Sequence, residues 1–276
     1  MIFLLSCMGN TRWAGAKIAQ ATGDKVVDVL RTKERRFVLG ADERIGFCFP
    51  VHGWRPPLLL RRFISELTIT RGEDVADTAG VRQDNVATAS GAPGRPYVYA
   101  VMTAGDTCGE AVDMLRADLS RRGLSLDSSF SLLMPETYVG LPFMNVDTKV
   151  TERRKIAQAE RQLEEFIPMI VARRSGEEHV VRGRWPRVNS RLLGALFIAC
   201  LVTDKPFKVD AARCDGCGEC RRRCPVGNIG WASGRPVWLH TGRCMSCFVC
   251  YHHCPHHAIE YGRRTRGKGQ YRGVES

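Results

Sequence analysis

The sequence predicts an α/β fold in which a doubly wound parallel sheet is followed by a small α+β domain. Through residues 1–174, apolar runs of strand length alternate with segments of helical periodicity. This alternation is typical of a parallel sheet covered by helices on both faces. Eight of the twelve cysteines then fall between Cys214 and Cys254. A segment of about 60 residues has little core of its own and is commonly stabilised by bound metal. The chain therefore divides into a sheet domain at 1–174, a linker with an apolar connecting helix at 175–205, a cysteine-rich domain at 206–262 and a basic tail at 263–276.

The elements of the sheet domain follow from these patterns in chain order. Apolar runs predict strands at 1–6, 26–29, 45–50, 97–103 and, as the last strand, 130–134. Helical periodicity predicts helices at 11–22, 57–67, 107–122 and 147–174.

The remaining segments are predicted from composition. Residues 70–96 have no period and are rich in Ala, Gly, Asp and Thr, so we expect an exposed, partly disordered excursion. We expect the apolar helix at 191–202 to pack between the domains. Its basic flank makes adsorption to a membrane surface the competing interpretation. We expect the tail, RRTRGKGQYRG at 263–273, to be a solvated basic arm.

The composition is that of a soluble globular protein. Apolar residues make up 44% of the chain and the mean hydropathy is −0.20, which excludes collagen-like, mucin-like and wholly disordered chains. The longest apolar run, Leu192–Val202, is too short to cross a bilayer. No basic region precedes the apolar start at Met1–Leu5, so we expect no export signal and a cytoplasmic location.

One cysteine pattern occurs twice in the C-terminal domain. The segments CDGCGECRRRCP at 214–225 and CMSCFVCYHHCP at 244–255 both have the spacing Cys-x-x-Cys-x-x-Cys-x-x-x-Cys-Pro. Three thiolates at this spacing hold three corners of a 4Fe–4S cubane, and the cysteine before proline ligates the other cluster. The sequence therefore predicts two 4Fe–4S clusters, one held by Cys214, Cys217, Cys220 and Cys254 and one held by Cys244, Cys247, Cys250 and Cys224.

Other uses of these cysteines fit the pattern less well. A zinc ion takes four ligands and does not explain a third cysteine at the same spacing followed by Cys-Pro. Disulfides are rare in a protein without an export signal. A degenerate repeat that no longer binds metal would not be expected to keep all eight ligands. The small residues Gly216, Gly218 and Ser246 let backbone amides approach the sulfurs. Four histidines near Cys254 are expected to be exposed loop residues: His252, His253, His256 and His257.

The loop after the first strand is a candidate anion site. Residues 6–11, SCMGNT, join a strand to a helix, and a small, hydroxyl-containing loop at a helix N-terminus presents backbone amides to an anion. Two further loops, PVHGW at 50–54 and TAGDTCG at 103–109, also follow strands. All three are expected at the carboxyl edge of the sheet, where parallel α/β sheets bind ligands.

This arrangement resembles flavodoxins, whose first loop wraps the FMN phosphate and whose two later loops flank the isoalloxazine ring. Together with the cysteine motifs, residues 1–262 resemble the flavodoxin–ferredoxin fusion proteins of anaerobes. The resemblance implies a flavodoxin-like sheet domain joined to a ferredoxin-like two-cluster domain. It rests on GNT at 9–11, Pro50-x-x-Gly53-Trp54, Thr103-Ala-Gly105, MPETY at 134–138 and PVW at 236–238.

The resemblance also implies an FMN site. Met8 departs from the flavodoxin pattern, in which a hydroxyl residue usually stands at this position, and Arg12, one residue beyond the motif, offers a compensating charge. A flavodoxin-shaped scaffold that binds flavin weakly or not at all is the alternative, and Cys7, Cys48 and Cys108 then serve as small apolar fillers. The residues that the resemblance places at the flavin are Ser6, Met8, Gly9, Asn10, Thr11, Pro50, Gly53, Trp54, Thr103, Gly105, Asp106 and Cys108.

These observations predict an electron-transfer protein that passes single electrons between its clusters, FMN and a redox partner. The alternative is a flavin-dependent reductase that acts on a small substrate with its own clusters as the electron relay, with His52 and Asp106 as candidate proton donors.

Charge suggests the kind of partner. The net charge is +12, and residues 206–276 carry +7 of it; about +3 remains there after two clusters with their thiolates are counted. We therefore expect a redox protein with an acidic docking face. Nucleic acid is not expected as a partner, because the sequence has no helix-turn-helix or zinc-finger pattern and no aromatics interleaved with the basic tail.

Overall fold

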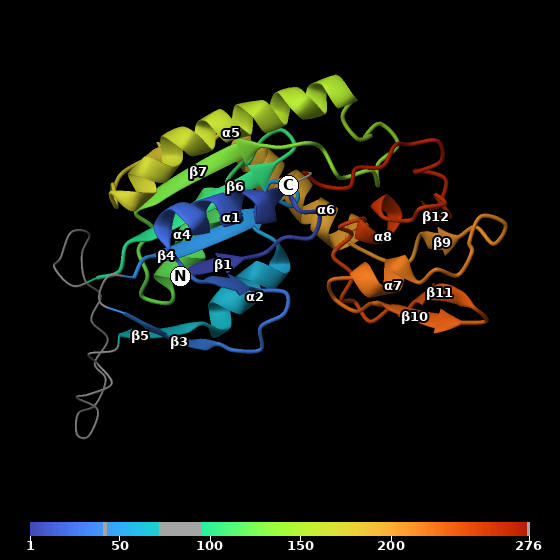
Figure 1. The fold of residues 1–276 in the computed structure, drawn as a ribbon, viewed down its shortest axis with the longest axis horizontal. Coiled ribbons are helices and arrows are strands. Elements are labelled where there is room, and N and C mark those ends of the chain that lie inside the picture. Colours follow the sequence, from blue (N-terminus) through green and yellow to red (C-terminus); the bar gives the residue numbers. More distant parts are fainter. Residues whose placement is uncertain (41–42, 72–94, 275–276) are drawn as a thin grey trace.

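A six-stranded sheet organises the N-terminal domain in the computed structural model, which describes residues 1–40, 43–71 and 95–274 (Figure 1). The strands are β1 (Ile2–Leu4), β2 (Val26–Asp28), β4 (Ile45–Pro50), β6 (Val98–Ala104), β7 (Ser128–Leu133) and β8 (Glu178–His179). They lie in the order β2-β1-β4-β6-β7-β8, and every adjacent pair is parallel. The predicted α/β class with a parallel sheet is therefore confirmed.

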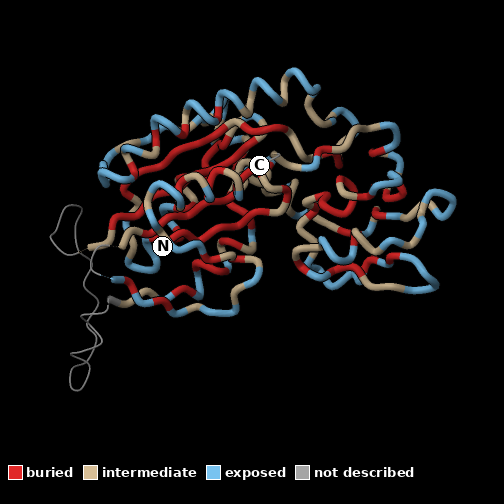
Figure 2. Tube along the Cα trace, viewed as in Figure 1, coloured by how far each residue is buried: buried red, intermediate tan, exposed pale blue. Residues whose placement is uncertain are grey.

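Helices cover both faces of this sheet. On one face lie α1 (Asn10–Thr22) and α5 (Lys149–Val171), and on the other lie α2 (Leu58–Glu66) and α4 (Ala111–Ser120). Figure 2 shows the strands as a buried layer and α5 as a helix with a repeatedly exposed outer side. The four helices predicted from periodicity are all present; α1 begins one residue earlier than predicted, and the other three are shorter than predicted.

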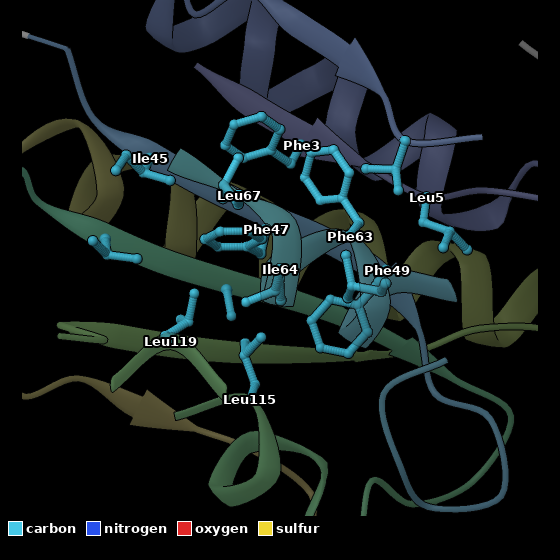
Figure 3. Packing of buried hydrophobic residues seen from close by; sticks show 14 of the residues in the cluster. Phe3, Leu5, Ile45, Phe47, Phe49, Phe63, Ile64, Leu67, Leu115 and Leu119 are labelled. Atoms are coloured by element: carbon cyan, nitrogen blue, oxygen red, sulfur yellow. The ribbon is translucent and has the colours of Figure 1, made fainter. Parts of the chain in front are cut away.

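Alternation along each strand fills two separate cores. In β4, Ile45, Phe47 and Phe49 point towards α2 and α4 and belong to the same core as Phe63 (Figure 3). Cys48 points to the opposite face, among residues that contact α1 and α5. Because successive side chains of a strand point to opposite faces, a strand that is apolar throughout must be covered on both sides.

Gly46 allows a close contact between β4 and the ring of Tyr99 in β6. It pairs in register with Tyr99 of the neighbouring strand β6. A Cβ atom on Gly46 would overlap the Tyr99 ring, so the ring lies over the strand where a side chain is missing. The fit between β4 and β6 therefore depends on this glycine.

The sequence did not predict three strands. β3 (Arg36–Leu39) and β5 (Thr68–Arg71) form a separate parallel pair, from which Phe37 and Leu39 enter the core below α2. β8 makes the edge of the large sheet, so the expectation that the strand near 130–134 is the last one was wrong. Each of these strands has at most four residues, too few for a clear period. Most of the expected excursion at 70–96 lies outside the described residues.

The connecting helix begins as the π-helical segment η1 (Val188–Leu193) and continues as α6 (Gly194–Leu201). Figure 1 shows α6 between the sheet domain and the C-terminal domain, as predicted. Ser190, which has no exposed surface, fixes its start: its hydroxyl donates to the Trp54 carbonyl at 2.9 Å and accepts from the Glu110 amide at 2.8 Å.

The C-terminal domain consists of short elements around a small aromatic core. Its helices are α7 (Glu219–Arg223) and α8 (Val249–His252); its two antiparallel pairs are β9 (Phe207–Val209) with β12 (Ile259–Tyr261), and β10 (Ile229–Ala232) with β11 (Arg235–Trp238). Ser233 and Gly234 join β10 to β11 with φ of 49° and 74°, the left-handed pair that a tight hairpin requires. Phe207, Trp238, Phe248 and Tyr261 pack together inside.

The tail is not the solvated arm that its basic composition suggested. Thr265 and Tyr271 are 1% and 2% exposed. The Lys268 ammonium donates to the Val139 carbonyl at 3.0 Å, and the Gln270 amide donates to the carbonyls of Tyr251 and Cys254. These contacts draw the tail across the junction of the two domains, because its basic side chains find backbone carbonyls there.

The Gly46 contact gives a test of the sheet. Gly46→Ala should lower the free energy of unfolding by about 1–3 kcal/mol, because the added methyl group overlaps a ring that is itself fully buried. Urea unfolding followed by circular dichroism measures the loss. Gly40→Ala is the control: its methyl group would lie 3.7 Å from the flexible Glu43 side chain, so its effect should stay within about 0.5 kcal/mol. Equal losses in the two variants would contradict the close packing of β4 against β6.

Candidate functional site

The eight cysteines of the repeated motif lie in two groups, and each group contains members of both motifs. Cys214, Cys217, Cys220 and Cys254 line one small cavity. In the second group, the thiols of Cys244, Cys247 and Cys224 lie close enough to Cys250 to raise its pKa. Within the described residues, no three His, Cys, Asp or Glu side chains converge on a site for a single metal ion. A cubane is larger and has its four cysteines spread around it, and the first group surrounds a space in this way.

The two cysteine loops share a backbone pattern that repeats every thirty residues. Left-handed φ angles occur at Gly216, Gly218 and Gly227 in the first half, and at Ser246, Phe248 and His257 in the second. The first loop thus has glycine wherever φ is positive. The second reaches the same conformation with side chains present.

Backbone amides approach three of the sulfurs, and Ser246 is the donor among them that the sequence predicted. The Asn228 amide donates to Cys224 Sγ at 3.2 Å, and the Ala258 amide, thirty residues later, donates to Cys254 Sγ at 3.2 Å. The Ser246 amide donates to Cys244 Sγ at 3.4 Å. Such hydrogen bonds stabilise negative charge on the sulfurs and help to set the reduction potential of a bound cluster.

Burial keeps these thiols protonated when no metal is bound. It raises the pKa of Cys220 to about 11 and that of Cys244 to about 12. The pKa of Cys250 is also raised well above its ordinary value. Iron ligation needs thiolates, so cluster loading must release protons and is favoured by higher pH.

A second, larger cavity of about 820 Å³ lies at the carboxyl edge of the sheet. Loops that follow β1, β4, β6 and β7 form one side of it, α6 forms another, and Met245, Ser246 and Cys247 of the second cysteine loop close it. Ten of the predicted flavin-site residues line this cavity: Ser6, Met8, Asn10, Thr11, Pro50, Gly53, Trp54, Thr103, Gly105 and Asp106.

Two predicted residues lie elsewhere. Gly9 is not part of the cavity wall; its backbone, with φ of 104°, faces Gly273 of the tail. Cys108 is fully buried in the core on the α4 side of the sheet, where burial raises its pKa to about 12. Cys108 therefore lies outside the cavity that ten of the predicted flavin-site residues line. Cys108 is an apolar filler, because a thiol in such surroundings stays protonated.

The polar side chains of the first loop bond within the protein. Asn10 donates to the Pro135 carbonyl at 3.1 Å and accepts from the Tyr271 hydroxyl at 2.5 Å. The hydroxyls of Thr11 and Thr103 share a hydrogen bond of 2.7 Å. Ser6 Oγ accepts from the Arg12 amide. The Arg12 amide is thus already bonded, so the groups left for an anion are the Ser6 O–H and the other first-turn amides of α1, which have no intrahelical acceptor.

The charge offered by Arg12 is directed elsewhere. Its guanidinium lies 3.5 Å from the carboxylate of Asp28, at the end of β2. The Arg12 side chain is also 53% exposed. The attraction for an anion at this loop therefore comes mainly from the helix dipole and the amides.

Several cavity residues were not predicted as site residues. Leu193, Leu196 and Phe197 come from the connecting helix, and no local pattern marks a helix side that faces a distant loop. Glu136 lies in the MPETY segment; burial raises its pKa, and its Oε1 accepts from the amides of Thr137 and Tyr138 at 2.8 and 2.7 Å. His52, a candidate proton donor, is held neutral because burial lowers its pKa to about 4.

The cavity and the second cysteine group adjoin. Cys247 belongs to both, and Cys7 of the first loop lies in hydrogen-bonding contact with it. Met8 packs against Val249 and Tyr271. The first loop of the sheet domain therefore rests directly on the second cysteine loop.

His252 strengthens this junction and is not the exposed loop residue that was expected. It has no exposed surface. Its Nδ1 accepts from the Tyr271 amide at 3.2 Å, which leaves Nε2–H to donate to the Thr137 carbonyl at 2.8 Å. Burial lowers its pKa to about 4, so the neutral ring that these two bonds require is the stable form.

Comparison with known proteins identifies the C-terminal domain. The family model of the 4Fe–4S dicluster domain matches residues 213–259, which contain both cysteine motifs. This match supports bound 4Fe–4S clusters and a role in iron–sulfur electron transfer. No curated protein and no solved structure matches the chain. In the part of the chain that the structure describes, no helix is long and apolar enough to span a membrane.

The grouping of cysteines across the two motifs can be tested by cluster loss. Cys254→Ser should remove the same cluster as Cys217→Ser, because both residues line one cavity, and iron should fall from about eight to about four atoms per chain. Iron analysis combined with low-temperature electron paramagnetic resonance distinguishes the two clusters. Cys200→Ser, a change of an exposed cysteine outside the motifs, should keep all the iron. Loss in Cys254→Ser of the cluster that Cys247→Ser removes would contradict the grouping.

The hydrogen bond between Tyr271 and Asn10 predicts that the tail stabilises the first loop. Tyr271→Phe leaves the buried Asn10 Oδ1 without this donor and should cost about 1–3 kcal/mol, with faster hydrogen exchange in residues 6–11. The matched control is Tyr99→Phe, because the Tyr99 hydroxyl is buried without a partner among the described residues. Removal of that hydroxyl should be neutral or stabilising. Unchanged exchange in Tyr271→Phe would show that the loop is ordered without the tail.

Proposed function

We propose that the chain is an electron-transfer protein that holds two 4Fe–4S clusters in its dicluster domain and FMN in the cavity at the sheet edge. One observation supports the flavin most directly. A cavity large enough for a cofactor lies at the carboxyl ends of β1, β4 and β6, and Cys247, a predicted cluster ligand, forms part of its wall.

The topology supports the same assignment. With β3 and β5 set aside, the first five strands of the large sheet have the order 2-1-3-4-5. Flavodoxins have this order and bind FMN at the switch point between the first and third strands. In this chain that point lies between β1 and β4, where the loops at 6–10 and 50–54 leave the sheet.

The residues around the cavity suit the parts of FMN. The first-turn amides of α1 suit the phosphate. Trp54 is held in place by its indole N–H, which donates to Thr107 Oγ1 at 3.0 Å, and it offers a flat partner for the ring. Tyr138 and Phe197 pack edge to face at 5.0 Å and exclude water from the far side. Bound FMN exchanges one or two electrons and a 4Fe–4S cluster exchanges one.

The cysteine groups lie in series between solvent and the cavity. Cys217 of the first group is exposed, and Cys220 of that group lies close enough to Cys250 of the second group to raise its pKa. Cys247 of the second group reaches the cavity. The first group, which reaches solvent at Cys217, is therefore the proposed docking point for a redox partner, and the positive charge of residues 206–276 favours an acidic partner face.

The reductase alternative also has an observation in its favour. Glu136 and Asp106 line the cavity together, and the raised pKa of Glu136 lets it carry a proton closer to neutral pH than an ordinary glutamate. Such a group suits the transfer of a proton to a bound small molecule. A substrate-dependent oxidation of the reduced protein, lost in Glu136→Gln, would favour this function over a simple carrier.

The proposed function is tested by cofactor content after reconstitution without oxygen. About eight iron atoms and one FMN per chain are expected, with the flavin fluorescence quenched on binding. The full iron content without flavin, even after FMN is added, would leave a two-cluster protein attached to a flavodoxin-shaped scaffold.

Replacement of Trp54, an aromatic residue in the cavity wall, gives a sharper test of flavin binding. Trp54→Ala should weaken FMN binding about 2- to 10-fold, the usual worth of one aromatic contact, while the iron content stays unchanged. Fluorescence titration with FMN measures the change. Trp185→Ala, a change of a tryptophan that is 70% exposed and outside the cavity wall, is the matched control. Equal affinities in the two variants would remove Trp54 from the flavin site.

A further inference from the structure

The connecting helix exposes an apolar surface at the edge of the large cavity. Trp185, Val188, Leu192 and Leu196 are between 48% and 70% exposed. Val188, Leu192 and Leu196 recur every four residues, so they lie along one side of the helical segment, and Trp185 lies just before its start. We call these four residues the apolar stripe. Leu196 also lines the cavity, as does Phe143, which is 83% exposed, so the stripe is continuous with the opening of the cavity.

The composition of this helix limits what can cover it. From Leu192 to Leu201 no side chain carries a conventional hydrogen-bonding group. The side of the same helix that carries Leu193, Phe197 and Leu201 already lines the cavity. Interfaces with folded proteins usually contain a hydrogen bond for every 100–200 Å², which this stretch has no side chains to provide. The boundary between lipid headgroups and acyl chains requires none.

Charge complements this apolar stripe. Arg184 and Arg187 lie at its N-terminal end and Arg191 lies within its span, and the side chains of Arg187 and Arg191 are 83% and 70% exposed. Both face the single carboxylate of Glu110, at 3.9 and 2.7 Å, so their combined charge is only half balanced there. Arg184 lies over the Trp185 ring at 5.5 Å. Arginine beside tryptophan is typical of a segment at a lipid interface, where each basic residue near an anionic surface favours binding.

We propose that the apolar stripe, together with Phe143, rests on an anionic lipid bilayer, with the connecting helix parallel to the membrane plane. The helix is too short to cross the membrane, so it lies at the headgroup boundary. Membrane contact at this surface places the opening of the cavity against the lipid. The inference uses the exposed surface and its charge, and it does not depend on whether the cavity binds FMN.

The test is flotation of the reconstituted full chain with lipid vesicles. Vesicles of equal parts phosphatidylcholine and phosphatidylglycerol should carry the protein upward, and phosphatidylcholine alone should carry much less. The double change Val188→Glu with Leu192→Glu should weaken partitioning at least about tenfold; neither residue lines the cavity. Arg184→Glu with Arg187→Glu should weaken binding to the anionic vesicles by a similar factor.

The control is Val38→Glu, which changes a valine that is 56% exposed on β3. It introduces one of the same acidic side chains into an exposed apolar position away from the helix, and this variant should bind vesicles as the unchanged protein does. Iron content checks that each variant is folded. Unchanged flavin affinity in the Val188 and Leu192 variant would show that the membrane contact is separate from the FMN site.

Three outcomes would overturn the proposal. The first is no flotation of the unchanged protein. The second is equal loss in Val38→Glu and in the stripe variant, which would place the contact elsewhere. The third is self-association, seen by light scattering, that the stripe variant abolishes while vesicles bind neither protein. That result would make the stripe an interface between copies of the chain.

Discussion

Eight thiols concentrated in one small domain are the constraint on which the rest of the structure depends. Burial raises the pKa of Cys220, Cys244 and Cys250 far above neutral, so the thiols do not ionise there without a strong cationic partner. Iron supplies that partner, and each loop must then hold its sulfurs around a cluster. The domain therefore consists of tight turns and helices of four and five residues, with a small aromatic core between them.

A domain held by metal still has to be fixed to the rest of the chain, and the junction shows how this is done. His252 bonds to Thr137 on one side and to the tail at Tyr271 on the other. Tyr271 in turn bonds to Asn10 at the start of α1. One continuous chain of hydrogen bonds thus connects a residue between two cluster ligands to the first loop of the sheet. Because all three side chains are buried, loss of any one partner leaves a polar group without compensation.

The parts of this structure that the sequence could predict are those with a local period or a fixed spacing. β4 agrees with its predicted bounds at 45–50, because a six-residue apolar run between polar segments has few other interpretations. The cysteine spacing likewise indicated the clusters. The rest depends on contacts between distant residues. Three features can be seen only in the folded chain. They are the burial of Cys108, the position of Phe197 in the cavity wall and the hydrogen bond from the tail to Asn10. The basic composition of the tail suggested that it is solvated. Composition alone could not show that backbone carbonyls from distant residues lie within reach of the tail.

The repeat of thirty residues also shows how one motif adapts to two surroundings. Where the first loop has Gly216 and Gly218, the second has Ser246 and Phe248 in the same left-handed conformation, which costs about 1 kcal/mol or more for a residue with a side chain. Contacts offset this cost. Ser246 Oγ accepts from the Thr203 amide at 3.0 Å, and Phe248, 1% exposed, packs on Tyr138 and Phe207. Glycine suffices in the first loop, where Cys217 is exposed to solvent. The second loop needs side chains because it faces the sheet domain. The two loops therefore differ according to what they face: the first loop has Cys217 exposed to solvent, and the second loop has Cys247 in the wall of the cavity.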